Sequence, residues 1–224
     1  MASATSETPL SAEQVFDAVG PAYEAAFAGL VPQEASIAWL LDQLKDQKPA
    51  KVLDIGCGTG RPVCYALAEA GHDVLGIDIS SAMIEDARKK VPKASFQKVD
   101  VSDYKPGAES LDAVTVYFSM IASVTQDQIR KNIENIYGWL RPGGVFVFAT
   151  VPVAGNNMTI RWMGHPVVVS SLTVEDTLAA VRDVGFNVVH HEASNFLPHG
   201  AEAGICKAEE VWEEPHVFIY ARKP

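Results

Sequence analysis

The sequence predicts an α/β fold in which a mostly parallel sheet is covered by helices on both faces. From Ala50 onward, short β-branched runs alternate with amphipathic stretches, which is the pattern of repeated strand–helix–strand units. Most of these runs are continuously apolar, as expected of strands that helices bury on both faces. At 224 residues and 48% hydrophobic composition the chain has enough apolar material for one core, so we expect a single domain.

The elements follow in order along the chain. Residues 1–8 are expected to form a loose end, and residues 12–44 two helices broken near Pro32. We assign residues 1–48 to an N-terminal helical cap and residues 49–224 to the core of the same domain. The predicted strands are Lys51–Ile55, Asp73–Ile77, Ala94–Val99, Leu111–Tyr117, Val145–Thr150, Phe186–His191 and His216–Ala221.

Capping signals mark the helices late in the chain. Thr125 with Gln128, and Thr173 with Asp176, predict two helix starts, because a threonine N-cap and a polar third residue satisfy free backbone N–H groups. The run 142–144 (PGG) and Gly185 predict where these two helices end.

Composition and charge exclude several classes of function. The formal net charge is -10 and no cluster of Lys and Arg interrupts it, so we expect no nucleic-acid partner. The chain lacks the long apolar segment of a membrane span and the basic start of a secretory signal, so we expect neither membrane insertion nor secretion. The three cysteines match no disulfide or zinc spacing and fit free thiols in a cytoplasmic protein.

A glycine-rich turn follows the first predicted strand. Residues 52–60 read VLDIGCGTG, with Gly56, Gly58 and Gly60 separated by Cys57 and Thr59. A strand that turns sharply into a helix needs glycine at positions of positive φ or close ligand approach, and it directs backbone N–H groups into the crevice. Arg61 stands where a dinucleotide-binding loop has its third glycine, which argues against a nicotinamide or flavin cofactor.

Three acids lie at the ends of successive predicted strands. Asp54 precedes the glycines, Asp78 follows the second strand and Asp100 the third. In doubly wound folds an acid at the position of Asp78 binds ribose hydroxyls, because a carboxylate accepts from both. Asp100 is then placed to accept from an adenine amino group, with Ile79 and Val101 as apolar walls for the ring.

These segments together resemble the class I S-adenosylmethionine-dependent methyltransferases, a family with a seven-stranded Rossmann-like sheet. The matching segments are VLDIGCGTG at 52–60, GIDIS at 76–80, KVDVSD at 98–103, LDAVTVYFSM at 111–120 and LRPGGVFVFAT at 140–150. The resemblance implies S-adenosylmethionine as cofactor and a last strand inserted antiparallel beside its neighbours. It also implies that Asp54 and the loop with Gly56, Cys57, Gly58 and Gly60 hold the methionine end, Asp78 the ribose and Asp100 the adenine.

The same resemblance implies a small-molecule acceptor. Residues 151–172, including RWMGHP at 161–166, are expected on the acceptor side, and Tyr23 to close over the methionine moiety. Tyr117 and Phe118 should line the cofactor site near the sulfonium, because aromatic faces stabilise a cation, and Met83 is placed in the site too. His165 and His216 are the candidate bases if the acceptor must lose a proton.

Other interpretations remain at this point. The expected activity is methyl transfer to O, N, S or C of a metabolite; the alternatives are non-methylating chemistry such as cyclisation, or a catalytically silent binding subunit. No metal site is expected, because the His, Glu and Cys residues of 191–206 match no ligand spacing. The pairs at 209–210 and 213–214 are predicted to form an acidic surface, and the oligomeric state is left open.

Overall fold

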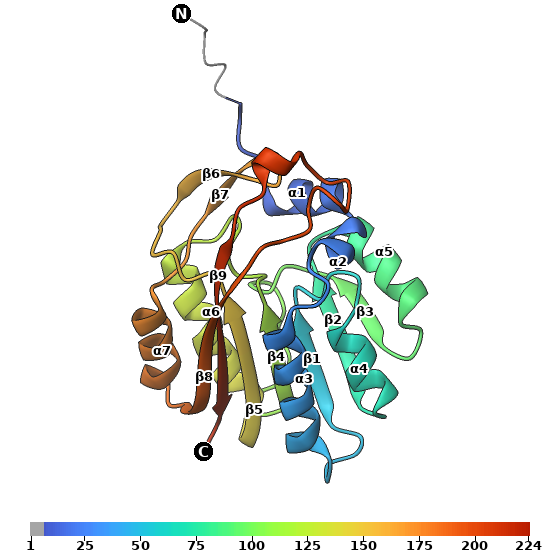
Figure 1. The fold of residues 1–224 in the computed structure, drawn as a ribbon. Coiled ribbons are helices and arrows are strands. Elements are labelled where there is room, and N and C mark those ends of the chain that lie inside the picture. Colours follow the sequence, from blue (N-terminus) through green and yellow to red (C-terminus); the bar gives the residue numbers. More distant parts are fainter. Residues whose placement is uncertain (1–6) are drawn as a thin grey trace, which may run out of the picture.

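The computed structural model describes residues 7–224, so most of the predicted loose end over residues 1–8 lies outside the described residues. Seven strands form one sheet, in the order β3-β2-β1-β4-β5-β9-β8 (Figure 1). Their bounds are β1 Lys51–Ile55, β2 Asp73–Asp78, β3 Ser95–Lys98, β4 Leu111–Tyr117, β5 Leu140–Thr150, β8 Asn187–Phe196 and β9 Glu214–Arg222. All seven predicted strands are present.

The sheet is mostly parallel, as predicted. The strands β1 to β5 pair in parallel, and β9 pairs antiparallel with both β5 and β8. The antiparallel last strand confirms the expectation from the family resemblance. Because parallel strands end at one edge of a sheet, Ile55, Asp78 and Tyr117 come together at the carboxyl edge of β1, β2 and β4.

Strand β5 begins earlier than predicted. Leu140 already pairs with Leu111, and the register then shifts before Val145 pairs with Ala113. The sequence Pro142-Gly143-Gly144, which we expected to end a helix, is therefore an irregularity inside the strand. Gly143 has a φ of 78°, a conformation that glycine adopts without steric cost.

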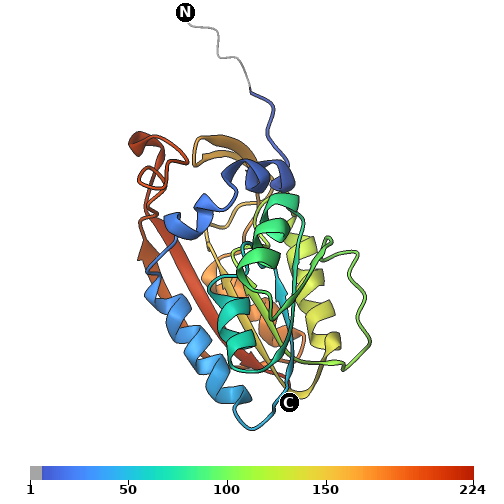
Figure 2. The same cartoon turned by 90° about the vertical axis from the view of Figure 1, so that its right-hand side faces the viewer.

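Helices cover both faces of the sheet (Figures 1 and 2). One face packs against α3 (Val31–Leu44), α4 (Val63–Glu69) and α5 (Ser81–Lys90), and the other against α6 (Gln126–Trp139) and α7 (Val174–Asp183). Successive strand residues alternate between the two cores, so that Val52 belongs to the first and Leu53 to the second. Helices α6 and α7 begin directly after Thr125 and Thr173, as predicted.

The N-terminal segment differs from the prediction of two helices broken near Pro32. It forms α1 (Ala12–Val19), α2 (Ala22–Ala26) and α3, and the breaks fall at residues 20–21 and 27–30. Pro32 is the second residue of α3, where a missing N–H is tolerated because first-turn N–H groups have no helical partner. Helices α1 and α2 lie over the carboxyl edge of the sheet, whereas α3 packs along β5 and β9 (Figure 1).

A hairpin that we did not predict lies over the carboxyl edge beside α1. Strands β6 (Met158–Trp162) and β7 (His165–Val169) form a separate two-stranded sheet joined by Met163 and Gly164, both with positive φ. Val167 forms a bridge with Leu10, just before α1. The hairpin and α1 share a small hydrophobic cluster, the roof cluster, whose buried members are Val15, Val19, Val167 and Val169.

Candidate functional site

The glycine loop between β1 and α4 is shaped by three glycines with positive φ, Gly56, Gly58 and Gly60. A Cβ at Gly56 would overlap the side chain of Ser119, which follows β4, and one at Gly60 would lie 3.0 Å from Phe96 and Val91. By contrast, a Cβ at Gly58 would meet nothing within 4 Å. The first and third glycines therefore permit close packing of the loop, and the second faces open space.

Asp78 at the end of β2 is tied to this loop. Its Oδ2 accepts from the backbone N–H of Gly58 at 2.9 Å, and its Oδ1 accepts from that of Ser80 at 2.8 Å. Burial raises the pKa of Asp78 above its ordinary value, and the backbone donors oppose that rise. Each carboxylate oxygen has a lone pair left for a ligand hydroxyl.

Asp54 lies deeper, beneath the loop, and is 2% exposed. Its carboxylate accepts from the Thr115 hydroxyl at 2.7 Å and from the Cys64 thiol at 3.2 Å. Loss of solvation raises the pKa of Asp54 to about 6, although both donors favour the charged form. A cation bound above this carboxylate would therefore displace a proton over part of the neutral pH range.

This raised pKa predicts how stability depends on pH. The folded protein holds the Asp54 proton more tightly than the unfolded chain, whose ordinary value is 3.8, so the group's contribution is most favourable below that value and is lost as pH rises through about 6. The free energy of unfolding of wild type minus that of Asp54→Asn should fall by about 2 kcal/mol between pH 4 and pH 7. Urea unfolding from pH 4 to pH 7 measures it, with exposed Asp73→Asn as the control. A difference independent of pH would contradict the assignment.

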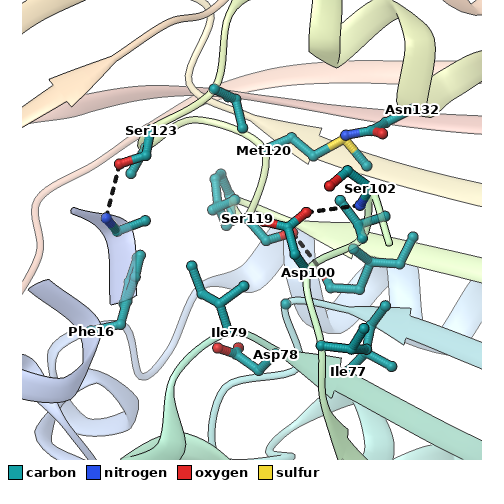
Figure 3. A pocket seen from close by; sticks show the side chains of 18 of the residues that line it. Phe16, Ile77, Asp78, Ile79, Asp100, Ser102, Ser119, Met120, Ser123 and Asn132 are labelled. Atoms are coloured by element: carbon teal, nitrogen blue, oxygen red, sulfur yellow. Dashed lines mark hydrogen bonds between the residues drawn. The ribbon is translucent and has the colours of Figure 1, made fainter. Parts of the chain in front are cut away.

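Three neighbouring cavities lie at the carboxyl edge. The acid-lined cavity, about 520 Å³, has Asp78 and Asp100 in its wall, together with Ile79, as Figure 3 shows. The loop cavity, about 300 Å³, is bounded by Asp54, the glycine loop and α2. The apolar cavity, about 420 Å³, lies between the hairpin, α1, α2 and the start of β9.

Tyr23 and Phe118 line all three cavities, which therefore meet at these two rings. Tyr23 belongs to α2 and stacks on Phe27, with ring centroids 4.5 Å apart. Burial raises the pKa of Tyr23 well above its ordinary value, and the charges of Glu214 and Asp78 raise it further. Tyr23 therefore lines both the cavity that holds Asp78 and the cavity that holds Glu214.

The structure brings most of the predicted cofactor residues together. The acid-lined cavity is lined by Tyr23, Gly56, Gly58, Asp78, Ile79, Met83, Asp100, Val101, Tyr117 and Phe118. Asp54 and Cys57 line the adjoining loop cavity. Gly60 lines neither cavity, because it packs beneath the loop against Phe96 and Val91. Its role is therefore in shaping the loop.

The two candidate catalytic histidines do not line these cavities. His165 begins β7 at the hairpin turn and borders a shallow hollow with Cys206 and Lys207. His216 is 1% exposed and packs against Phe118, with ring centroids 4.4 Å apart. Its Nε2 lies 3.2 Å from Oε2 of Glu214, and both Glu214 and Phe118 stand between the imidazole and the apolar cavity. This geometry does not support either histidine as a base in contact with an acceptor.

Several site residues were not predicted. Glu214 was expected in an acidic surface, but it is 6% exposed and lines the apolar cavity. Asp17 of α1 accepts from Ser80 Oγ at 2.6 Å, and Glu24 of α2 accepts from Thr59 Oγ1 at 3.0 Å and from Lys90 Nζ at 2.7 Å. These bonds fasten α1 to the loop after β2, and α2 to the loop after β1 and to the end of α5. In the sequence these acids are only polar residues of the N-terminal helical segment, and no motif indicates which residues they contact.

Within residues 7–224 no three His, Cys, Asp or Glu side chains gather in a way that would hold a metal ion. None of the helices formed by these residues combines the length and the apolar character needed to cross a membrane.

Comparison with known sequences gives one family. Residues 52–144 match the family described as "Methyltransferase domain". The chain is similar to methyltransferase GfsG of Streptomyces halstedii, with 30% identity over 122 residues, which is 52% of this chain and 43% of that protein. The first curated relatives are matched over 43 to 46% of their length, so the chain covers less than half of each.

Comparison with solved structures gives the same fold. The cyclase SpnF superposes with a TM-score of 0.68 at 18% identity, over 97% of each chain. A SAM-dependent methyltransferase from Methanosarcina mazei superposes with a TM-score of 0.64 at 19% identity, over 79% of this chain and 93% of that one. At such identities the likeness concerns the fold.

Proposed function

We propose that the chain, whose residues 52–144 match the "Methyltransferase domain" family, is a class I S-adenosylmethionine-dependent methyltransferase that transfers a methyl group from S-adenosylmethionine to a small organic acceptor. One observation carries the proposal: an acid-lined cavity, a loop cavity and an apolar cavity meet at Tyr23 and Phe118. A bound cofactor would extend through the first two, and an acceptor would enter the third. The methyl group would then pass between them beside these two rings.

The residues present fit the cofactor. Gly58 faces open space, and the free lone pairs of Asp78 suit two ribose hydroxyls. Asp100, with Ile79 and Val101, would hold the adenine. Asp54 and the glycine loop would hold the methionine end, whose ammonium group matches a buried carboxylate. When bound, S-adenosylmethionine supplies a methyl group activated by its sulfonium.

The protein's own contribution would be positioning and exclusion of water. Displacement at a sulfonium methyl needs little covalent assistance, so orientation of the acceptor and desolvation provide much of the rate. Tyr23 and Phe118 would shield the reacting groups and present aromatic faces to the positive charge. Glu24 and Asp17 keep α2 and α1 over the site through their bonds to Thr59, Lys90 and Ser80.

The test combines binding and product analysis. Calorimetric titration should give dissociation constants on the order of micromolar for both S-adenosylmethionine and S-adenosylhomocysteine. Incubation with S-adenosylmethionine and a library of small metabolites should yield one S-adenosylhomocysteine per methylated product. Binding of neither compound would reject the proposal and favour a silent binding subunit.

Cyclisation is the second candidate activity. It is favoured by the cyclase SpnF, which overlaps this chain over nearly its whole length, and by the low polarity of the apolar cavity, which suits an extended hydrocarbon. Such an activity would convert its substrate into an isomer of equal mass without forming S-adenosylhomocysteine. The product assay therefore separates the two candidates.

A further inference from the structure

The apolar cavity contains one buried carboxylate among aromatic rings. Its walls include Phe27 of α2 and Trp162 of the hairpin, whose ring centroids are 6.4 Å apart. Trp212 and Met158, both lining residues, are 41% and 39% exposed, which opens the cavity to solvent along an apolar rim. A molecule with an apolar body could therefore enter without losing polar contacts.

Glu214 is the buried acid. Its Oε1 accepts from the Trp162 indole N–H at 2.8 Å, which fixes the carboxylate in the cavity wall, and its Oε2 lies 3.2 Å from His216 Nε2. These two contacts use about half of the acceptor positions of a carboxylate. The remaining lone pairs are available to a ligand.

The structure provides little to neutralise Glu214. Among the described residues that line the apolar cavity there is no Lys, Arg or His. His216 touches the carboxylate, but its Nδ1 is buried without a hydrogen-bond partner within residues 7–224. Since Nδ1 has no partner, a ring that donates from Nε2 and leaves Nδ1 without a hydrogen fits the contacts. Among the described residues, the Glu214 carboxylate then faces no cationic side chain in the cavity wall.

We infer that the apolar cavity binds an acceptor with a protonated amine on an apolar, ring-containing body, the amine pairing with Glu214. A buried carboxylate without a cation is unfavourable, and a ligand ammonium would provide the missing charge. The surrounding aromatic faces attract cations as well. This inference rests on the proposed function, since it names the class of acceptor for the same site.

The experiment compares two probes of equal shape, 1-naphthylmethylamine and 1-naphthylmethanol. Each is titrated by calorimetry at pH 7.5 into protein saturated with S-adenosylhomocysteine. The amine should bind at least about tenfold more tightly than the alcohol, because one added charge-assisted bond contributes about 1.5–3 kcal/mol. Equal binding, tighter binding of the alcohol or no binding of the amine would overturn the inference. This comparison needs no variant.

Two matched variants then locate the effect. Glu214→Gln should reduce the preference for the amine to within about twofold, with the alcohol bound as in wild type. Glu209→Gln removes the same charge from a nearby exposed residue that lines none of the three cavities, and should keep the full preference. A preference that survives in Glu214→Gln would contradict the assignment.

Titration with S-adenosylhomocysteine alone separates this inference from the proposed function. If the protein binds S-adenosylhomocysteine but does not prefer the amine, only the acceptor class is wrong. If S-adenosylhomocysteine does not bind, the proposed function fails and the inference that rests on it fails too.

Discussion

Replacement of Asp78 by alanine is expected to weaken the binding of S-adenosylmethionine and S-adenosylhomocysteine by at least about 100-fold. In our proposal this carboxylate accepts from two ribose hydroxyls, and each charge-assisted bond is worth about 1.5–3 kcal/mol. The substitution also removes the acceptors of the Gly58 and Ser80 N–H groups, so the loop that faces the cofactor loses its tie to β2. Both losses act in the same direction.

Calorimetry on the purified variant measures this effect. Asp73→Ala provides the control, since Asp73 is exposed at the opposite end of the same strand and should leave affinity unchanged. A circular dichroism melt checks that both variants fold. Affinity within a factor of about two of wild type in Asp78→Ala would show that the ribose is held elsewhere.

Substitution of Gly56 by alanine should destabilise the fold by about 2–5 kcal/mol. The new Cβ would overlap Ser119, whose hydroxyl donates to the Ile55 carbonyl at 2.7 Å, and the residue would keep a φ of 69° that L-residues disfavour. Overpacking costs about 1–3 kcal/mol and the left-handed conformation about 1–2 kcal/mol. Denaturant unfolding at equilibrium provides the measurement.

Two companion variants separate these contributions. Gly58→Ala has the same backbone problem, with a φ of 52°, but open space around its Cβ, so it should lose only about 1–2 kcal/mol. Ser119→Gly combined with Gly56→Ala removes the overlap and should recover part of the lost stability. If the Gly56 and Gly58 variants are equally stable, close packing against Ser119 is not what requires glycine.

The sheet was predictable because its signals are local. Continuous apolar runs identified β1 and β4 with their exact bounds, and threonine caps located the starts of α6 and α7. Asp54, Asp78 and Asp100 could be placed together for the same reason, since parallel strands deliver their carboxyl ends to one edge. For these three acids, the position relative to the end of a parallel strand is enough to predict their place at the edge of the sheet.

The hairpin and the depth of individual acids were not predictable in this way. The turn between β6 and β7 is Met163-Gly164, which lacks the Asn-Gly or Asp-Gly signal of a tight hairpin. Glu213 and Glu214 are adjacent in the sequence, yet one is exposed and the other is enclosed by Trp162 of the hairpin. Burial of Glu214 depends on contacts with distant segments, and no pattern within residues 209–214 encodes it.

The roof cluster has a consequence for how ligands reach the site. Its buried valines join α1 to the hairpin, while the two larger cores lie on either side of the seven-stranded sheet. Few buried contacts and a surface position are the properties of a segment that opens locally at a lower free energy than the whole molecule unfolds. Amide hydrogens of α1 and β7 should therefore exchange with solvent well before those of β1 and β4. Cofactor and acceptor would then enter through the same local opening of α1 and the hairpin. A change that makes this opening more frequent would raise the association and dissociation rates of both ligands.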